Sequence, residues 1–208
     1  GEDPVIDKDD ENNLIFIGLI SFYDPPKEGI ISVLDKMKRS HISVKMITGD
    51  NRLVAVQVGK QIGLASDSVI TGSEIFSLTD DALAIKVNDI DIFAEIEPLQ
   101  KQKIVRALQK SGKTVGFLGD GINDASALKT ADVGITVNNA MDVAKDAAGI
   151  VLLEKDFEVL LDGVYEGRRT FSNTLKYIYL TTSANFGNMV SMAVASLFLP
   201  FLPLTPTQ

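Results

Sequence analysis

Two short acidic segments carry residue types that could hold a phosphoryl group and a divalent cation. In each, an apolar run ends at a Gly-Asp pair and a helical pattern follows: Thr48-Gly49-Asp50 in the first, and Gly119 to Asp124 in the second. In an open α/β sheet, polar residues at the carboxyl ends of strands lie where ligands bind. Asp120 and Asp124 offer the carboxylate oxygens that a hard cation such as Mg2+ prefers. These patterns predict part of a phosphoryl-transfer site.

The first segment also has an explanation in local structure. The Thr48 hydroxyl and the neighbouring backbone N–H groups could hold a phosphoryl oxygen, but a threonine after a strand is also common as a helix cap or turn residue. Asp50 could likewise cap the helix expected from Asn51 onward. The residue types alone leave both explanations open.

A third candidate is Lys101, close to the start of a helix that Pro98 is expected to open. A lysine there can neutralise phosphate as a point charge, whereas most lysines are simply solvated at the surface. Lys101 and Lys103 lie about 200° apart around a helix, so we expect only one of them to face the site.

The second acidic segment, Gly119-Asp120-Gly121-Ile122-Asn123-Asp124, is far richer in special residues than a capping turn requires. Asp120 stands at the end of a predicted strand and is the best candidate for a cation ligand. Asn123 and Asp124 are expected to begin the next helix, whose N-terminus also favours anions. We therefore predict a functional site here, with Asp120 and Asp124 as metal ligands.

No residue of the chain is a convincing nucleophile for this site. Asp89-Ile90-Asp91 has two spaced aspartates, but no apolar strand precedes it. The single histidine, His41, excludes a multi-histidine centre, and the absence of cysteine excludes thiolate ligands. The net charge of -8 argues against nucleic acid as a partner.

The elements that must position these residues alternate between strands and helices. Apolar runs predict strands over Leu14–Phe22, Ile42–Ile47, Ile92–Ala94, Thr114–Leu118, Val133–Val137 and Ile150–Leu153. Helical spacing predicts helices after Lys27, over Asn51–Ile62 and from Pro98, with two short helices within Val69–Asn88. This alternation predicts an α/β fold with a mostly parallel, Rossmann-like sheet and right-handed crossovers.

Beyond the last predicted strand, apolar residues keep helical spacing from Phe157 to Ile178. This spacing predicts one long helix that leaves the α/β domain. We assign residues 154–183 to a stalk helix.

The end of the chain has the composition of a membrane segment. No charged residue follows Lys176, and residues 184–204 are mostly apolar over about the length that spans a bilayer as a helix. Prolines from Pro200 onward predict that the helix ends near Leu199. A buried helix in a soluble core is the alternative. We predict a transmembrane helix, cut short, over residues 184–208.

Taken in order, these motifs resemble those of the P-type ATPases, cation pumps of the haloacid dehalogenase-like superfamily. Asp24-Pro25-Pro26-Lys27 is similar to their hinge between nucleotide-binding and phosphorylation domains, and Thr48-Gly49-Asp50 to their second phosphate-binding motif. Lys101 is similar to their motif lysine, and residues 119–124 are similar to their Mg2+ motif. Asn185-Phe186-Gly187-Asn188 is most similar to the magnesium-transporting branch.

The resemblance implies that the chain is a C-terminal part of an ATP-driven pump, with ATP and Mg2+ as cofactors. The transported ion is a cation, and resemblance to the magnesium-transporting branch implies that this cation is Mg2+. Residues 1–23 would end the nucleotide-binding domain, and residues 24–153 would form most of the phosphorylation domain. The implied catalytic residues are Thr48, Lys101, Asp120 and Asp124. The implied cofactor-binding residues are Thr48, Gly49, Asp50, Lys101 and Asn123, with Asp120 and Asp124 as metal ligands.

The resemblance also implies a location and partners. The pump would lie in the cell inner or plasma membrane, with its soluble part in the cytoplasm, and this chain would contact the lipid bilayer and the remaining domains. The family's phosphorylated aspartate, in an Asp-Lys-Thr-Gly-Thr motif, and its strand are missing from this sequence, so the fragment alone is expected to be inactive. A soluble phosphohydrolase of the same superfamily and an inactive, truncated, membrane-tethered binding module are the alternatives.

Overall fold

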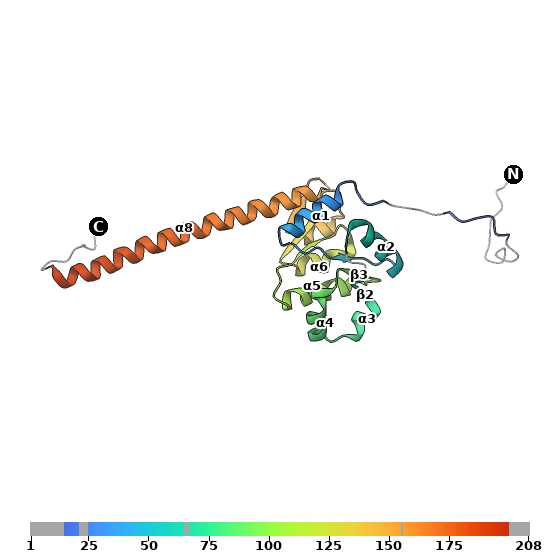
Figure 1. The fold of residues 1–208 in the computed structure, drawn as a ribbon, viewed down its shortest axis with the longest axis horizontal. Coiled ribbons are helices and arrows are strands. Elements are labelled where there is room, and N and C mark those ends of the chain that lie inside the picture. The colour runs from blue at the N-terminus through green and yellow to red at the C-terminus, as the bar shows by residue number, and fades with distance from the viewer. Residues whose placement is uncertain (1–14, 21–24, 65–66, 155, 200–208) are drawn as a thin grey trace.

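The computed structural model describes residues 15–20, 25–64, 67–154 and 156–199. Most of these residues form an α/β domain, and one long helix projects from its side (Figure 1). The predicted α/β class and the parallel pairing of its strands are confirmed.

The described strands form two parallel sheets of three strands each. The first has the order β1 (Met46–Ile47), β3 (Ile92–Ala94) and β2 (Val69–Thr71). The second has the order β4 (Gly116–Leu118), β5 (Val133–Val137) and β6 (Ile150–Leu152). β1 and β4, the strands that carry the two predicted site loops, each lie at one edge of their own sheet.

Helices connect and cover these strands. The α-helices are α1 (Ile30–Arg39), α2 (Arg52–Ile62), α3 (Gly72–Ser77), α4 (Asp80–Lys86), α5 (Pro98–Lys110), α6 (Ala125–Thr130), α7 (Asp142–Ala147) and α8 (Phe157–Phe198). Two 3-10 turns, η2 (Val87–Asp89) and η3 (Ile122–Asp124), precede β3 and α6.

One hydrophobic core holds both sheets together. It contains Phe93 of β3, Phe117 of β4 and Val137 of β5, together with Ile104 of α5 and Leu128 of α6. Burial of these apolar side chains is the main favourable contribution to the fold. Because α5 and α6 both share this core, the residues at their N-termini are held at a fixed spacing.

The predicted strand over Leu14–Phe22 is wrong for its described part. Residues 15–20 form no strand, and their large side chains are exposed, with Ile17 at 98%. A strand requires a neighbour that pairs with its backbone groups, and no strand of the described structure pairs with this segment. Leu14 and residues 21–22 lie outside the described residues.

Other predicted strands are present but shorter. The strand expected over Ile42–Ile47 is limited to Met46–Ile47, and those at Thr114–Leu118 and Ile150–Leu153 are also trimmed at their ends. Strand bounds depend on how many residues find a partner in the ladder, which an apolar run does not reveal. Val69–Asn88 contains the two predicted short helices and also β2, which was not predicted.

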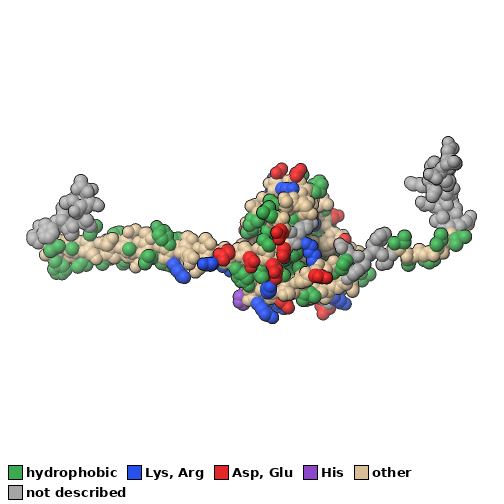
Figure 2. Space-filling model, turned by 90° about the horizontal axis from the view of Figure 1, so that it is seen from above, with side chains coloured by type: hydrophobic (Ala, Val, Ile, Leu, Met, Phe, Trp, Pro, Cys, Tyr) green, Lys and Arg blue, Asp and Glu red, His purple; other side chains and the backbone are tan. Residues whose placement is uncertain are grey.

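The long helix α8 runs without interruption for 42 residues, about 63 Å at 1.5 Å per residue. It ends at Phe198, as the prolines predicted. Charged side chains gather near the domain, and the distal part shows none (Figure 2). Within the described residues, no helix combines the length and mean hydropathy of a bilayer span.

The proximal part of α8 is docked on α1. Leu161 packs against Val33 and Met37 in a small separate core. The Lys36 ammonium pairs with the Glu158 carboxylate at 2.6 Å, and Arg168 donates a hydrogen bond to the Ser40 carbonyl at 2.7 Å. These contacts attach the helix to the domain at its first turns only.

Candidate functional site

The first predicted loop follows β1 directly. The Thr48 N–H donates to the Phe93 carbonyl of β3 at 2.9 Å, so the loop begins where the ladder ends. The Thr48 hydroxyl donates to the Asp50 carboxylate at 2.8 Å and accepts from the Asp50 N–H at 3.0 Å. Asn51, not Asp50, caps α2 by accepting from the Leu53 N–H at 2.8 Å. Thr48 and Asp50 are therefore turn residues, with Gly49 and Asp50 exposed.

The segment after β3 ties this loop to the helix that carries Lys101. The Ile96 N–H donates to the Thr48 carbonyl at 3.0 Å, and the Glu95 N–H donates to the Asp50 carbonyl at 2.9 Å. Glu95 has a φ of 56°, a conformation that is uncommon for a residue with a side chain. This bend leads into α5, which Pro98 opens as predicted.

Gln100 stabilises the start of α5 and was not predicted. Its amide oxygen accepts from the Glu97 N–H at 2.9 Å, and its amide nitrogen donates to the Gly72 carbonyl at 2.9 Å. The signal in the sequence was its position three residues after Glu97, which is the spacing of a capping box. Gln100 therefore fixes the first turn of α5, where Lys101 lies.

Lys101 and Asp124 form the best-defined contact of the site. The Lys101 ammonium lies 2.7 Å from the Asp124 carboxylate, and only 16% and 12% of the two side chains are exposed. Lys103 instead donates to the Leu78 carbonyl at 3.1 Å, so one lysine of the pair faces the site, as predicted. The structure thus brings together two predicted site residues from different elements.

The glycines of the second loop make room for Asp124. The Gly121 N–H donates to the Asp124 carboxylate at 3.2 Å. A Cβ added at Gly119 would lie 2.6 Å from the Asp124 Cβ, closer than two carbons can approach. The carboxyl group therefore packs on the α-carbon of Gly119, and a larger residue there would displace it.

Asp120 and Asn123 are exposed, as is Ile122 between them in the same loop. Asp120 follows β4 by two residues, and its carbonyl accepts from the Met141 N–H at 3.1 Å. Asn123 lies in the η3 turn, and α6 begins at Ala125, slightly later than predicted. The Asp120 side chain is exposed, whereas the Asp124 carboxylate is buried and bound by Lys101 and by the Gly121 N–H.

The donor set at this loop fits Mg2+. Mg2+ retains several waters and is bound in proteins through one or two carboxylates and substrate phosphates, so the exposed Asp120 and the buried Asp124 suffice. A protein-only cage is not formed, since no group of three or more histidine, cysteine or acidic residues gathers anywhere in the described ranges.

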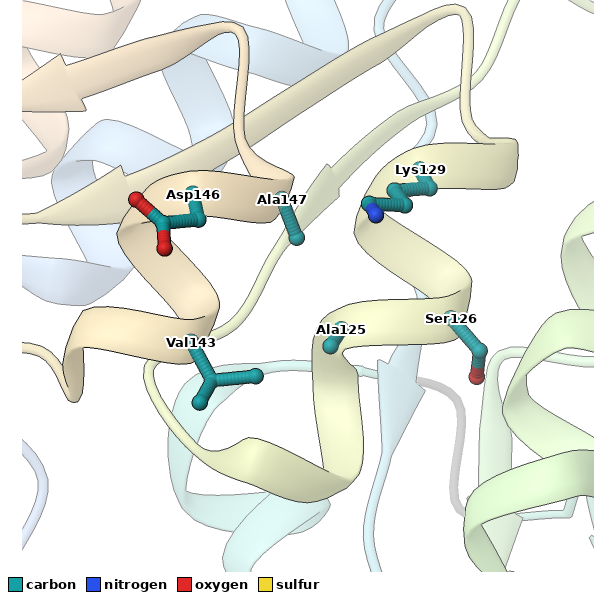
Figure 3. Close-up of a pocket in the computed structure, with 6 residues that line it drawn as sticks. All are labelled: Ala125, Ser126, Lys129, Val143, Asp146 and Ala147. Carbon is teal, nitrogen blue, oxygen red and sulfur yellow. The ribbon is translucent and has the colours of Figure 1, made fainter.

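A pocket of about 400 Å3 lies beside the predicted site, between α6 and α7 (Figure 3). Ser126 and Lys129 of α6 and Asp146 of α7 supply its polar groups. None of the predicted site residues lines this pocket. The structure brings Lys101 and Asp124 together, whereas the described hydrogen bonds of Thr48 and Asp50 tie the first loop to residues 93–96.

Comparisons with known proteins agree with the α/β fold. The sequence model of the haloacid dehalogenase-like hydrolases matches residues 2–132. A solved catalytic domain of the CPx-ATPase CopB-B superposes with a TM-score of 0.51 over 66% of this chain and 44% of that one. At 24% identity, the superposition shows a shared fold.

Curated proteins with higher identity are transport ATPases. The "Magnesium-transporting ATPase, P-type 1" of Salmonella typhimurium is 54% identical over 95% of this chain, and that of Escherichia coli K12 is 52% identical over the same share. The "Calcium-transporting ATPase 1" of Bacillus cereus is 39% identical over 94% of the chain. The chain spans 22% of the length of each of these relatives.

Proposed function

We propose, from the premise that this chain belongs to the haloacid dehalogenase-like hydrolases, that it supplies the magnesium- and phosphate-binding half of an aspartyl-phosphate site in a P-type cation pump. The observation that carries the proposal is the 2.7 Å contact between the Lys101 ammonium and the nearly buried Asp124 carboxylate. It supports the proposal because a lysine that could neutralise phosphate and a carboxylate that could bind a metal ion are in direct contact. The identity to magnesium-transporting ATPases supports Mg2+ as the cargo.

Each predicted residue has a role that its surroundings support. The Thr48 hydroxyl, at the end of β1, can rotate from the Asp50 carboxylate to a phosphoryl oxygen, with Gly49 leaving the backbone accessible. Lys101 neutralises phosphoryl charge, and Asp120 with Asp124 holds Mg2+. When bound, Mg2+ supplies positive charge against the charge that develops in phosphoryl transfer. Asp50 and Asn123 complete the polar rim toward ATP.

The acceptor aspartate comes from another part of the pump in this proposal. β1 and β4 are edge strands of two sheets that share one core. Both edges retain backbone groups that a further strand can pair with. We assign the nucleophile-bearing strand to the position between them, which would join the two sheets into one.

We further propose that residues 184–208 contribute a membrane helix in the complete pump, with 154–183 as its stalk. The support is the lack of charge after Lys176 and the exposure of large apolar side chains, such as Phe186 and Leu197, on distal α8. In membranes prepared from cells that produce this chain, carbonate extraction should leave it in the pellet. The same preparation should yield no acid-stable phosphoprotein with labelled ATP. Release by carbonate contradicts the anchor, and a hydroxylamine-sensitive phosphoprotein contradicts an acceptor supplied from elsewhere.

The Mg2+ site is tested by titrating the 208-residue chain with Mg2+ in a calorimeter. Asp120→Ala is expected to weaken Mg2+ binding by about tenfold or more, because it removes one of two carboxylate ligands. Asp81→Ala is the matched control, since it removes an aspartate that is 84% exposed on α4. Equal Mg2+ affinity of the Asp120→Ala variant and the unaltered chain would refute the site.

A further inference from the structure

Thr136 is a buried polar residue with no role so far. It lies in β5 between Ile135 and Val137 and is 0% exposed. Within the described residues, only Thr71 and Asp124 are other buried polar or charged side chains. A hydroxyl excluded from water needs a hydrogen-bond partner, so its partner shows what this threonine holds.

The partner is the residue that precedes Asp120. The Thr136 hydroxyl donates to the Gly119 carbonyl at 2.7 Å, which is a short and well-formed hydrogen bond. The Gly119 N–H donates to the Ile135 carbonyl at 3.2 Å. Both polar groups of Gly119 are therefore attached to β5, although β4 itself ends at Leu118.

The peptide group that follows Asp120 is held by the residue before α7. The Asp120 carbonyl accepts from the Met141 N–H, just before α7. The backbone of Asp120 is thus fixed between β5 and the start of α7, and the hydroxyl of Thr136 is the one side-chain group in this set of bonds. Without it, the Gly119 carbonyl would be free to turn, and the Asp120 side chain would turn with it.

Gly119 also sets the position of Asp124. The Asp124 carboxyl packs on the α-carbon of Gly119 so closely that no side chain fits there. A shift of Gly119 therefore moves both carboxylates relative to each other. The spacing of the two metal ligands depends on the peptide group that Thr136 holds.

We infer that Thr136 is a positioning residue that sets the spacing of Asp120 and Asp124 for Mg2+ through the Gly119 carbonyl. The inference rests on the proposed function of these carboxylates. Outer-shell hydrogen bonds of this kind typically change metal affinity by about 10- to 100-fold when they are removed. A purely structural threonine would affect folding and leave Mg2+ affinity unchanged.

The test is calorimetric titration of the 208-residue chain with Mg2+, using variants that separate the hydroxyl from its packing. Thr136→Val keeps the shape and removes the donor, and it is expected to weaken Mg2+ binding about tenfold. Thr136→Ser keeps the donor and is expected to stay within about twofold of the unaltered chain. Thr71→Val is the matched control, because it removes another buried threonine hydroxyl, one that pairs with Ser73 and Glu74.

Backbone NMR of the same proteins without Mg2+ supplies a readout independent of binding. Amide shifts of Gly119, Asp120 and Gly121 should move in Thr136→Val and return in Thr136→Ser. Unchanged Mg2+ affinity in Thr136→Val, or a serine variant as weak as the valine one, would overturn the inference. If the valine variant does not fold, Thr136→Ala takes its place with the same expected weakening, and unchanged Mg2+ affinity in that variant overturns the inference.

The result for Asp120→Ala separates the two proposals. If that variant loses Mg2+ binding and Thr136→Val does not, the positioning role fails and the proposed function stands. If neither change affects Mg2+ binding, the carboxylate site itself is wrong, and the positioning role fails with it.

Discussion

Asp124→Ala is expected to lower the free energy of unfolding by about 2–3 kcal/mol, as it leaves the Lys101 ammonium without its partner in a largely buried position. Breaking a fully buried pair costs about 3–5 kcal/mol, and the residual exposure of both side chains reduces this. The change also removes the acceptor of the Gly121 N–H. Urea unfolding followed by circular dichroism measures the effect.

A double-mutant cycle with Lys101→Met separates the ion pair from other effects. We expect a coupling of about 1–2 kcal/mol, with the double variant less destabilised than the sum of the single ones. Asp81→Ala is again the control, because Asp81 lies 2.6 Å from Lys110 but both side chains are more than half exposed. Surface pairs contribute little, so its stability should hardly change. Additive single effects at Lys101 and Asp124 would show that the contact does not stabilise the site.

Gly134→Ala is expected to destabilise the domain by about 2–4 kcal/mol. A Cβ at this position in β5 would lie 2.4 Å from the Leu128 carbonyl oxygen and 3.1 Å from its carbon. Both atoms belong to the backbone of α6, so the clash is relieved only by moving the helix away from the sheet. Because α6 follows Asp124 directly, Mg2+ binding should weaken as well.

Gly163→Ala is expected to raise the free energy of unfolding, in contrast to Gly134→Ala. Gly163 lies within α8, and an added Cβ there meets nothing within 4 Å. Alanine in a helix interior is favoured over glycine by about 0.5–1 kcal/mol. Both predictions are checked by comparing the urea unfolding midpoint of each variant with that of the unaltered chain. A Gly134→Ala variant as stable as the unaltered chain would show that β5 and α6 do not pack as closely as described.

The helices were predictable from local sequence. Helical spacing, with Pro98 as a first-turn residue, located the start of α5. The end of α8 at Phe198 followed from the prolines beyond it. The Gly-Asp pairs at Thr48–Asp50 and Gly119–Asp124 predict site loops from their residue types, and that assignment stays a prediction. Such features depend on neighbours within a few residues.

Strands were predictable only in part, because pairing is a property of two segments. The apolar run at residues 15–20 meets the compositional requirement for a strand yet has no strand partner in the described structure. β2 was missed because Val69–Thr71 was assigned, together with the residues that follow it, to two short helices. The division into two sheets, with β1 and β4 at their edges, depends on the order in which strands meet.

By itself, the sequence determined the residue types of the site, the helices that carry them and the class of fold. The tertiary structure decided which of them meet: Lys101 with Asp124 across 23 residues of chain, and Thr136 with Gly119 across 17. Thr48 had two explanations in the sequence: its hydrogen bonds to Asp50 show the turn, and its binding of phosphate stays a proposal. The physical reason is that hydrogen bonds and ion pairs between distant residues form only where the shared core fixes both elements, whereas periodicity and capping act within a few residues.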